Sequence, residues 1–184
     1  MILLRHGQSE FNLHFSASRR DPGIEDPVLT SLGHRQAEQA AADLAGIRLT
    51  RMIVSPYTRA LQTAAPILAE RRLDVEITDL VRERYAFTCD IGSHPGLLAE
   101  RFPHHDFAHL PEQWWPERME DEASVIARAD TFRARMAADR DWRSVILVSH
   151  WAFILALSGQ SLANGAWMRY DPATKAPESL VWHP

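Results

Sequence analysis

The stretch VILVSHWAFILALSG, residues 145 to 159, joins two apolar runs through the polar pair Ser149-His150. The first run, from Val145 to Val148, has the length and the β-branched content of a buried central strand. The second run, from Trp151 to Leu157, is typical of a buried helix, and Gly159 supplies its stop. A strand that leads into a helix is the repeating unit of α/β folds with a parallel sheet.

The same alternation extends over the rest of the chain and predicts an α/β fold with a mostly parallel sheet. Further strands are predicted at residues 2–4, 52–54 and, at an edge of the sheet, 75–77. Helices are predicted from Thr30 or Ser31 to about Leu44, over residues 58–70 and over residues 119–138. Pro66 is expected to kink or split the second of these helices. The segment around Pro22, Gly23 and Pro27 is predicted to be loop, and residues 168–182 are predicted to hold a hairpin.

Residues 84–116 do not share this regularity. They contain Pro95, Pro103, Pro111 and Pro116 and many aromatic and histidine side chains, with no helical or strand period. A connection of this length in a compact domain is more typical of a functional cap than of a linker. The chain of 184 residues suits a single domain, residues 1–184, that carries this cap-like insertion.

The composition argues against several classes of protein. The formal net charge of −4 gives no electrostatic reason to expect nucleic acid or an anionic membrane as a partner. The apolar runs are too short for the core of a signal peptide or for a membrane span. The single cysteine, Cys89, excludes an intramolecular disulfide and fits a reducing compartment, so we expect a cytoplasmic protein.

Three polar clusters follow three of the predicted strands. Arg5-His6 ends the first strand, Ser55-Pro56 with Arg59 follows the second, and Ser149-His150 follows the strand at 145–148. The carboxyl ends of parallel strands meet at one edge of a sheet, where open α/β sheets bind ligands. Two histidines and two arginines are therefore expected to converge there and to form an anion site.

The residue types suit a phosphate ester. Arginine presents forked donors that match phosphate oxygens, and the amide of Trp151, at a helix start, favours an anion. A neutral imidazole is a competent nucleophile, so His6 is a candidate for covalent phosphoryl transfer. His150 as imidazolium would neutralise charge on the transferring group. A carboxyl group with a raised pKa would have to donate a proton to the leaving oxygen.

Four segments, in order along the chain, resemble the signatures of the histidine phosphatase superfamily, the phosphoglycerate mutase-like proteins. They are LLRHGQSEFN from Leu3, LTSLGHRQA from Leu29, SPYTRALQTA from Ser55 and LVSHWAF from Leu147. The resemblance implies a three-layer α/β/α sandwich of the phosphoglycerate mutase type. It also implies a phosphomonoester hydrolase that works without a metal or an organic cofactor.

The resemblance assigns roles by position in these motifs. It makes His6 the phosphorylated nucleophile, and it places Arg5, Arg59 and His150 in the phosphate pocket with Asn12 as an additional polar contact. Glu83, in LVRERYAF, is the matching general acid and base, although this segment fits the family pattern less closely than the other four. Asp90 is the reserve candidate for the proton donor.

Two departures from the family pattern bear on function. Trp151 stands where relatives often have glycine, so its ring is expected to narrow the mouth of the site, and we count it among the substrate-binding residues. The first motif also resembles its mutase version, which makes a phosphoglycerate mutase-type isomerase the first alternative. Residues 84–116 lack the basic cluster that a mutase would need for a carboxylate and a second phosphate. A binding module for phosphorylated ligands that has lost turnover is the second alternative.

The remaining reactive side chains are given no role in the site. His104, His105 and His109 predict a surface cluster rather than a metal site, and Cys89 is taken as incidental. Trp114 and Trp115 either cover the substrate or attach the cap to the sheet. A phosphorylated small molecule is the expected substrate, with a phosphoprotein as an alternative. The sequence leaves the natural substrate and the oligomeric state open.

Overall fold

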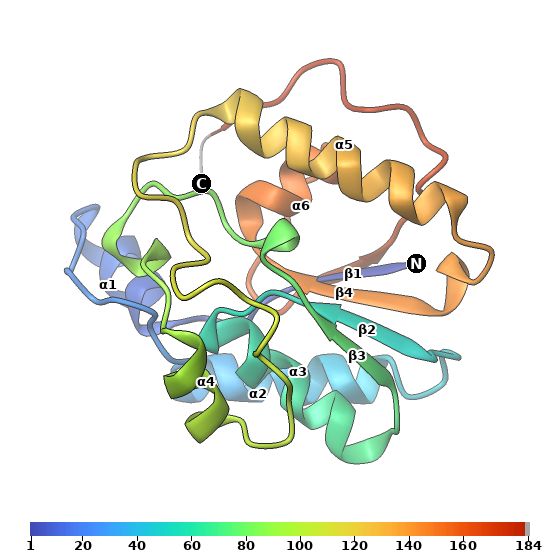
Figure 1. Cartoon of the computed structure of the whole chain (residues 1–184), viewed down its shortest axis with the longest axis horizontal. Helices are drawn as coiled ribbons and strands as arrows, with labels where there is room; N and C mark the ends of the chain where they lie inside the picture. Colours follow the sequence, from blue (N-terminus) through green and yellow to red (C-terminus); the bar gives the residue numbers. More distant parts are fainter. Residues whose placement is uncertain (183–184) are drawn as a thin grey trace.

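The computed structural model describes residues 1–182, which form a five-stranded sheet between two layers of helices (Figure 1). The strands are β1 (Ile2–Arg5), β2 (Arg51–Val54), β3 (Asp74–Ile77), β4 (Val145–Ser149) and β5 (Trp167–Arg169), in the order β3-β2-β4-β1-β5. The first four are mutually parallel, whereas β5 runs antiparallel to β1. The predicted α/β class, the central place of β4 and the edge position of β3 are confirmed.

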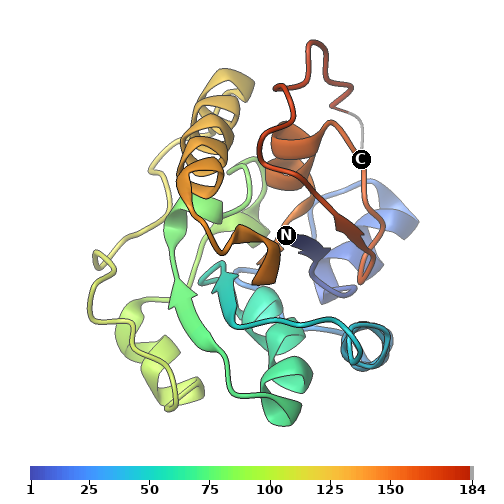
Figure 2. The same cartoon turned by 90° about the vertical axis from the view of Figure 1, so that its right-hand side faces the viewer.

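The two helix layers follow from the alternation of side chains along the strands. Ile2 and Leu4 of β1 face the helices α2 (Ser31–Asp43) and α3 (Thr58–Glu70). Leu3, between them, faces α5 (Glu122–Ala138) and α6 (Trp151–Ser158) on the other side. Figures 1 and 2 show these pairs of helices on opposite faces of the sheet, which confirms the three-layer sandwich.

A helix that was not predicted, α1 (Glu10–Ser18), follows β1 directly. Its start is fixed by a capping box, in which the Ser9 hydroxyl accepts from the Asn12 amide and the Asn12 side chain accepts from the Ser9 amide. The rings of Phe11 and Phe15 stack along one side with centroids 5.2 Å apart. The apolar residues of this helix do not form one continuous stripe, and Leu13 is half exposed. Hydrophobic periodicity therefore did not predict a helix here.

Other elements depart from prediction in smaller ways. α3 runs unbroken from Thr58 to Glu70 with Pro66 inside it, so the proline does not split the helix. α5 begins at Glu122 rather than near Met119, because the Asp121 side chain caps it by accepting from the Ser124 amide. The predicted hairpin in the tail is wrong: β5 pairs with β1 instead and covers its outer edge. Within residues 1–182, no helix combines the length and the apolar character that crossing a bilayer requires.

Most of the cap-like segment packs against the α2–α3 layer. It contains α4 (Pro95–Arg101), and its Leu98, Phe107 and Trp114 join the same core cluster as these helices. The Trp114 indole lies 4.6 Å from the Tyr57 ring and donates a hydrogen bond to the Ser93 carbonyl. Trp114 therefore attaches the segment to the helix layer. Only residues 84–90 of the segment line the site described below.

Candidate active site

The carboxyl ends of β1 and β4 bring two histidines together. Arg5 and Ser149 are register partners in the two strands, and the His6 amide donates to the Ser149 carbonyl at 3.0 Å. The next residues, His6 and His150, are both buried, with ring centroids 5.1 Å apart. The structure thus brings together the first and third of the polar clusters singled out in the sequence.

His6 is held in one tautomer by the backbone. Its Nδ1 lies 2.7 Å from the Gly7 carbonyl, which can only accept, so Nδ1 carries the hydrogen and Nε2 carries the lone pair. Burial lowers the pKa of His6 well below its usual value, and the guanidiniums of Arg59 and Arg5 lower it further. A neutral imidazole with a free Nε2 is the form of histidine that can act as a nucleophile.

Arg59, the second cluster's contribution, is locked in place. Its two terminal nitrogens donate to the Cys89 carbonyl at 2.8 Å and to the Asp90 carboxylate at 3.1 Å. Its guanidinium also lies 4.3 Å from the centre of the Tyr57 ring. These contacts fix the planar group beside His6 and leave its charge only partly balanced.

Arg5 is less constrained. One of its terminal nitrogens donates to the Leu162 carbonyl at 2.6 Å, and burial lowers its pKa to about 10, so it remains charged at neutral pH. Its Nε is buried and has no hydrogen-bond partner among the described residues. The same is true of Nδ1 of His150, whose Nε2 lies 2.7 Å from the Ser55 hydroxyl. Buried polar atoms without partners are costly, and a phosphate oxygen between these side chains would satisfy both.

The charge state of His150 differs from the expectation. Burial lowers its pKa well below the usual value, and the charges of Arg59 and Arg5 add to this effect. In the free protein the ring is therefore neutral. An imidazolium is favoured only when a bound anion compensates the surrounding positive charge.

Glu83 lines the same cavity as His6. Its Oε1 accepts from the Arg84 amide at 2.9 Å and from the Ala152 amide, at the start of α6, at 3.0 Å. Burial raises the pKa of this carboxyl, and the nearby charge of Asp90 raises it further. Both described hydrogen bonds use the same oxygen. A buried carboxyl group whose pKa is raised is suited to donate a proton to a ligand and to accept one from it.

Asp90, the reserve candidate, is fully engaged. Its Oδ1 accepts from Arg59, and its Oδ2 accepts from the amides of Ala86 and Phe87. Asn12 is also largely engaged, because its Oδ1 accepts from the Ser9 amide and from the Asn164 side chain at 3.1 Å. Both residues line the cavity, yet both serve first to hold neighbouring backbone and side chains in position.

A cavity of about 250 Å³ lies at the strand ends. It is lined by all of the candidate side chains described above except His150, which is fully buried. Trp151 lines it as expected, with its indole nitrogen donating to the Ser161 hydroxyl at 2.8 Å. Four aromatic residues of the lining were not identified from the sequence: Phe11, Phe15, Phe87 and Trp182. A capping box followed by phenylalanines at i and i+4 was the available signal for the first two.

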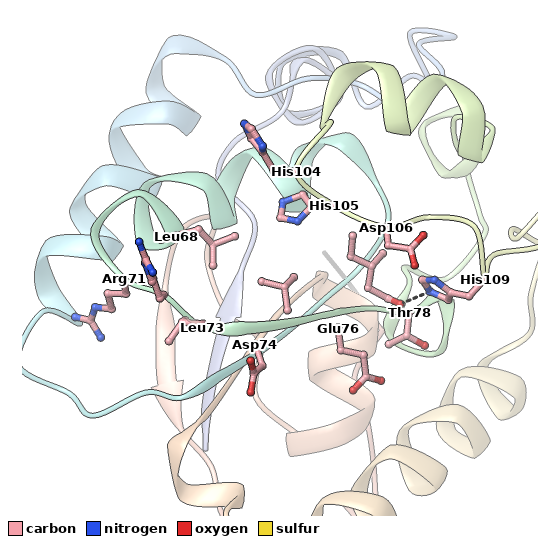
Figure 3. Close-up of a pocket in the computed structure, with 13 residues that line it drawn as sticks. Leu68, Arg71, Leu73, Asp74, Glu76, Thr78, His104, His105, Asp106 and His109 are labelled. Atoms are coloured by element: carbon pink, nitrogen blue, oxygen red, sulfur yellow. Dashed lines mark hydrogen bonds between the residues drawn. The ribbon is translucent and has the colours of Figure 1, made fainter.

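A wider pocket, of about 770 Å³, lies at the outer edge of β3 (Figure 3). His104, His105 and His109 border it, but they point in different directions, and His109 Nε2 donates to the Ile77 carbonyl at 2.7 Å. Across residues 1–182, no group of histidine, cysteine or acidic side chains is placed to hold a metal ion. None of the phosphate-site residues borders this pocket.

The sequence profile of the histidine phosphatase superfamily (branch 1) matches residues 1–174. The chain is 31% identical over 172 residues to glucosyl-3-phosphoglycerate phosphatase of Mycobacterium tuberculosis, a match that covers 88% of this chain and 74% of the relative. It is 31% identical over 178 residues to phosphoserine phosphatase 1 of Hydrogenobacter thermophilus, covering 89% and 78%. A shorter match, 42% over 101 residues, covers 55% of the chain and 46% of a 2,3-bisphosphoglycerate-dependent phosphoglycerate mutase of Thermoplasma acidophilum.

A solved structure of the mycobacterial glucosyl-3-phosphoglycerate phosphatase, in complex with VO3, superposes with a TM-score of 0.63 at 25% identity. The superposition covers 91% of this chain and 88% of that one. The profile match extends over nearly the whole chain, and it includes both site histidines. The chain therefore belongs to branch 1 of the histidine phosphatase superfamily.

Proposed function

We propose that the chain hydrolyses phosphate monoesters through a phosphohistidine at His6. The observation that carries this proposal is the buried, neutral His6, with Nε2 unprotonated, in one cavity with Arg5, Arg59 and the carboxyl group of Glu83. The named phosphatases among its relatives support the same class of reaction.

In the first step, Nε2 of His6 attacks phosphorus and the bond from phosphorus to the ester oxygen breaks. Glu83 gives its proton to that oxygen, so the alcohol leaves neutral. Arg5, Arg59 and His150 bind the three non-bridging oxygens, whose charge they stabilise during transfer. The products are the free alcohol and a phosphorylated His6.

In the second step, water attacks phosphorus and the bond to Nε2 breaks. Glu83, now ionised, takes a proton from the water, so the cycle returns both side chains to their starting states. The products are inorganic phosphate and neutral His6. Every charge and proton in this scheme is handled by side chains of the site, so we propose that turnover needs neither a metal ion nor an organic cofactor.

The direct test is trapping of the phosphorylated intermediate. Wild-type protein mixed with radiolabelled phosphate ester and quenched in alkali should retain label, and acid should remove it, because phosphohistidine is labile to acid. His6→Ala should show no label and no turnover, and a chelator such as EDTA should leave wild-type turnover unchanged. Undiminished turnover by the variant would refute the mechanism.

A phosphoglycerate mutase activity is the second candidate, favoured by the partial match to a mutase. A mutase must hold a carboxylate and a second phosphate, yet among the described lining residues Arg84 is the only cation beyond the two phosphate-site arginines. Arg84 is already paired with Glu122 at 3.4 Å. Interconversion of 2- and 3-phosphoglycerate that depends on a bisphosphorylated primer would establish the mutase. Tight vanadate binding without hydrolysis of any ester would instead establish the binding module.

The proposed substrate is a phosphorylated small molecule, in line with the substrates that the relatives' names give. A cytoplasmic location and the absence of nucleic-acid and membrane partners remain part of the proposal. The free, buried Cys89 supports a reducing compartment. Fractionation of cells that express the protein would test the location.

A further inference from the structure

The cavity beyond the phosphate site has an aromatic wall that the proposed reaction does not use. Phe11 and Phe15 of α1 meet Phe87, with ring centroids 5.4 Å apart for Phe11–Phe87 and 5.0 Å apart for Phe15–Phe87. All three rings line the same cavity as His6. Phe15 and Phe87 are only partly buried, so part of each ring is free to contact a bound molecule.

A second aromatic wall stands at the start of α6. The rings of Trp151 and Trp182 lie 6.4 Å apart between centroids, at an angle of 78°. The hydrogen bond from Trp151 to Ser161 holds the first ring, and the Arg84 guanidinium lies 5.6 Å from the centre of the Trp182 ring. Both indoles line the cavity. Two groups of aromatic rings therefore border the cavity next to the proposed phosphate site.

The charged groups of the cavity disfavour a second anionic group on the substrate. Among the described lining residues the cations are Arg5 and Arg59, which serve the phosphate, and Arg84. Arg84 is engaged, since its Nε donates to the Glu120 carbonyl at 2.9 Å and it pairs with Glu122. Glu83 and Asp90 add two carboxyl groups to the same lining. A substrate carboxylate would meet Glu83 and the ion-paired Asp90 here, and no described cation besides these three arginines.

We infer that the site is selective for phosphate esters whose alcohol carries a flat, apolar group, an aromatic ring above all, and that it discriminates against esters of hydroxy acids. Aromatic rings gain from offset and edge contacts with other rings, which Phe15, Phe87 and Trp182 offer. The inference rests on the proposed function and names its class of substrate. Phe15, Phe87, Trp151 and Trp182 become residues that determine specificity.

The test compares esters of primary alcohols, so that the bond being broken is alike in all of them. We expect kcat/KM for 2-phenylethyl phosphate to exceed that for glycerol 3-phosphate and for O-phosphoserine by about 10- to 100-fold, the range of apolar pocket contacts. Equal values, or a preference for O-phosphoserine, would overturn the inference.

Matched variants on one helix show whether the wall touches the substrate. Phe15→Ala should lower kcat/KM for 2-phenylethyl phosphate about tenfold and leave that for glycerol 3-phosphate unchanged. Leu13→Ala, on the same helix but half exposed and outside the cavity lining, should change neither. Phe15→Leu should keep most of the activity. An equal loss on all esters in Phe15→Ala would mean that the ring only supports the fold, against the inference.

A binding measurement separates failure of this inference from failure of the proposed function. Calorimetry with 2-phenylethylphosphonate and 3-phosphonopropionate, which cannot be hydrolysed, compares a ring with a carboxylate at similar reach. Tighter binding of the aromatic phosphonate supports the inference even if the protein hydrolyses nothing. In that case only the proposed hydrolase function is refuted. Tighter binding of the carboxylated one overturns the inference whatever the turnover.

Discussion

Two carboxyl groups, Glu83 and Asp90, lie near the same arginine and differ in what holds them. Asp90 accepts hydrogen bonds on both oxygens, from Arg59 and from two backbone amides, so its role is to fix the guanidinium and the turn at residues 86–90. Glu83 is held through one oxygen and lines the same cavity as His6. Position in the sequence suggested both residues, and their partners now favour Glu83 as the proton donor.

The substitution Glu83→Gln tests this difference. We expect steady-state turnover of an alkyl phosphate to fall about 100-fold or more, because neither the leaving oxygen nor the attacking water has its proton carrier. With p-nitrophenyl phosphate, whose leaving group needs little protonation, His6 should still be phosphorylated. Stopped-flow absorbance should then show a burst close to one equivalent of nitrophenol, followed by slow turnover. A linear time course without a burst would contradict the assignment.

Asp90→Asn is the matched control, and its main effect should be on stability. The change removes the charge that faces the buried Arg59, and breaking such a pair costs about 3–5 kcal/mol. Denaturant unfolding should show this loss, whereas Glu83→Gln should stay within about 1 kcal/mol of wild type, since Gln keeps an oxygen for the two amides. If the Asp90→Asn protein were stable and showed the burst kinetics described above, Asp90 would be the proton donor and Glu83 the residue with the structural role.

The low pKa of His150 in the free protein predicts proton uptake when an anion binds. A bound dianion offsets the charges of Arg5 and Arg59 and raises the pKa of the imidazole, so at neutral pH the complex holds more protons than the free protein. Calorimetry of tungstate, a dianion at neutral pH, in buffers of different ionisation enthalpy measures this uptake. His150→Asn should lose most of it. Net proton release by the wild type would show that another group dominates.

At the scale of the elements, α2 determines where the loop after His6 can run. The backbone of Gly33, in the first turn of α2, lies so close to this loop that a Cβ there would stand 2.1 Å from the Gln8 carbonyl oxygen. A Cβ on Gly7 would in turn lie 2.4 Å from the Gly33 carbonyl oxygen. The helix and the nucleophile loop are thus in direct backbone contact.

Gly33→Ala should therefore destabilise the protein, although alanine is the better helix former. We expect a loss of about 1–3 kcal/mol, the cost of forcing extra volume into a packed contact, together with reduced turnover as the His6 loop shifts. Thermal unfolding and kinetics measure both. Gly46→Ala, after the same helix, meets no atom within 4 Å and should be nearly neutral. Equal stability of the two variants would disprove the contact argument.

The elements that were predicted correctly are those in which consecutive residues are buried, because such elements have an uninterrupted apolar sequence. β4 and α6 are buried along almost their whole length, so their apolar runs alone identified them. α1 was missed because caps and a pair of rings stabilise it, and β5 was missed because its pairing depends on the uncovered edge of β1. Pro66 is tolerated within α3 because the buried Ala64 and Ile67 on either side anchor the helix against the core.

The residues of the candidate site likewise fall into those that the sequence could predict and those that it could not. Arg5, His6, Arg59 and His150 follow strands that were recognisable, and parallel topology was enough to bring them together. Phe11, Phe87 and Trp182 line one cavity but come from separate parts of the chain. Their proximity depends on the orientation of α1 and on the path of the C-terminal segment. No local pattern contains that information.

At the scale of the whole molecule, the sheet order predicts a gradient of stability. β1 and β4 have neighbours on both sides, whereas β3 has a strand on one side only. Amides of β1 and β4 should therefore exchange hydrogen only when the whole protein unfolds. Amides of β3 that face away from β2 should exchange through local opening. Hydrogen exchange followed by mass spectrometry measures this difference. Equal protection of β1 and β3 would contradict it.

The place of β1 between β4 and β5 also sets the order in which the protein can assemble. Leu3 pairs with Leu147 on one side and with Met168 on the other, so β1 waits for partners that are synthesised much later than β1 itself. Contacts of such long sequence separation form slowly, because a large loop must close before they contribute. The pocket around His6 is therefore complete only after residues 145–169 have also been synthesised. A growing chain therefore carries the nucleophile long before it is able to use it.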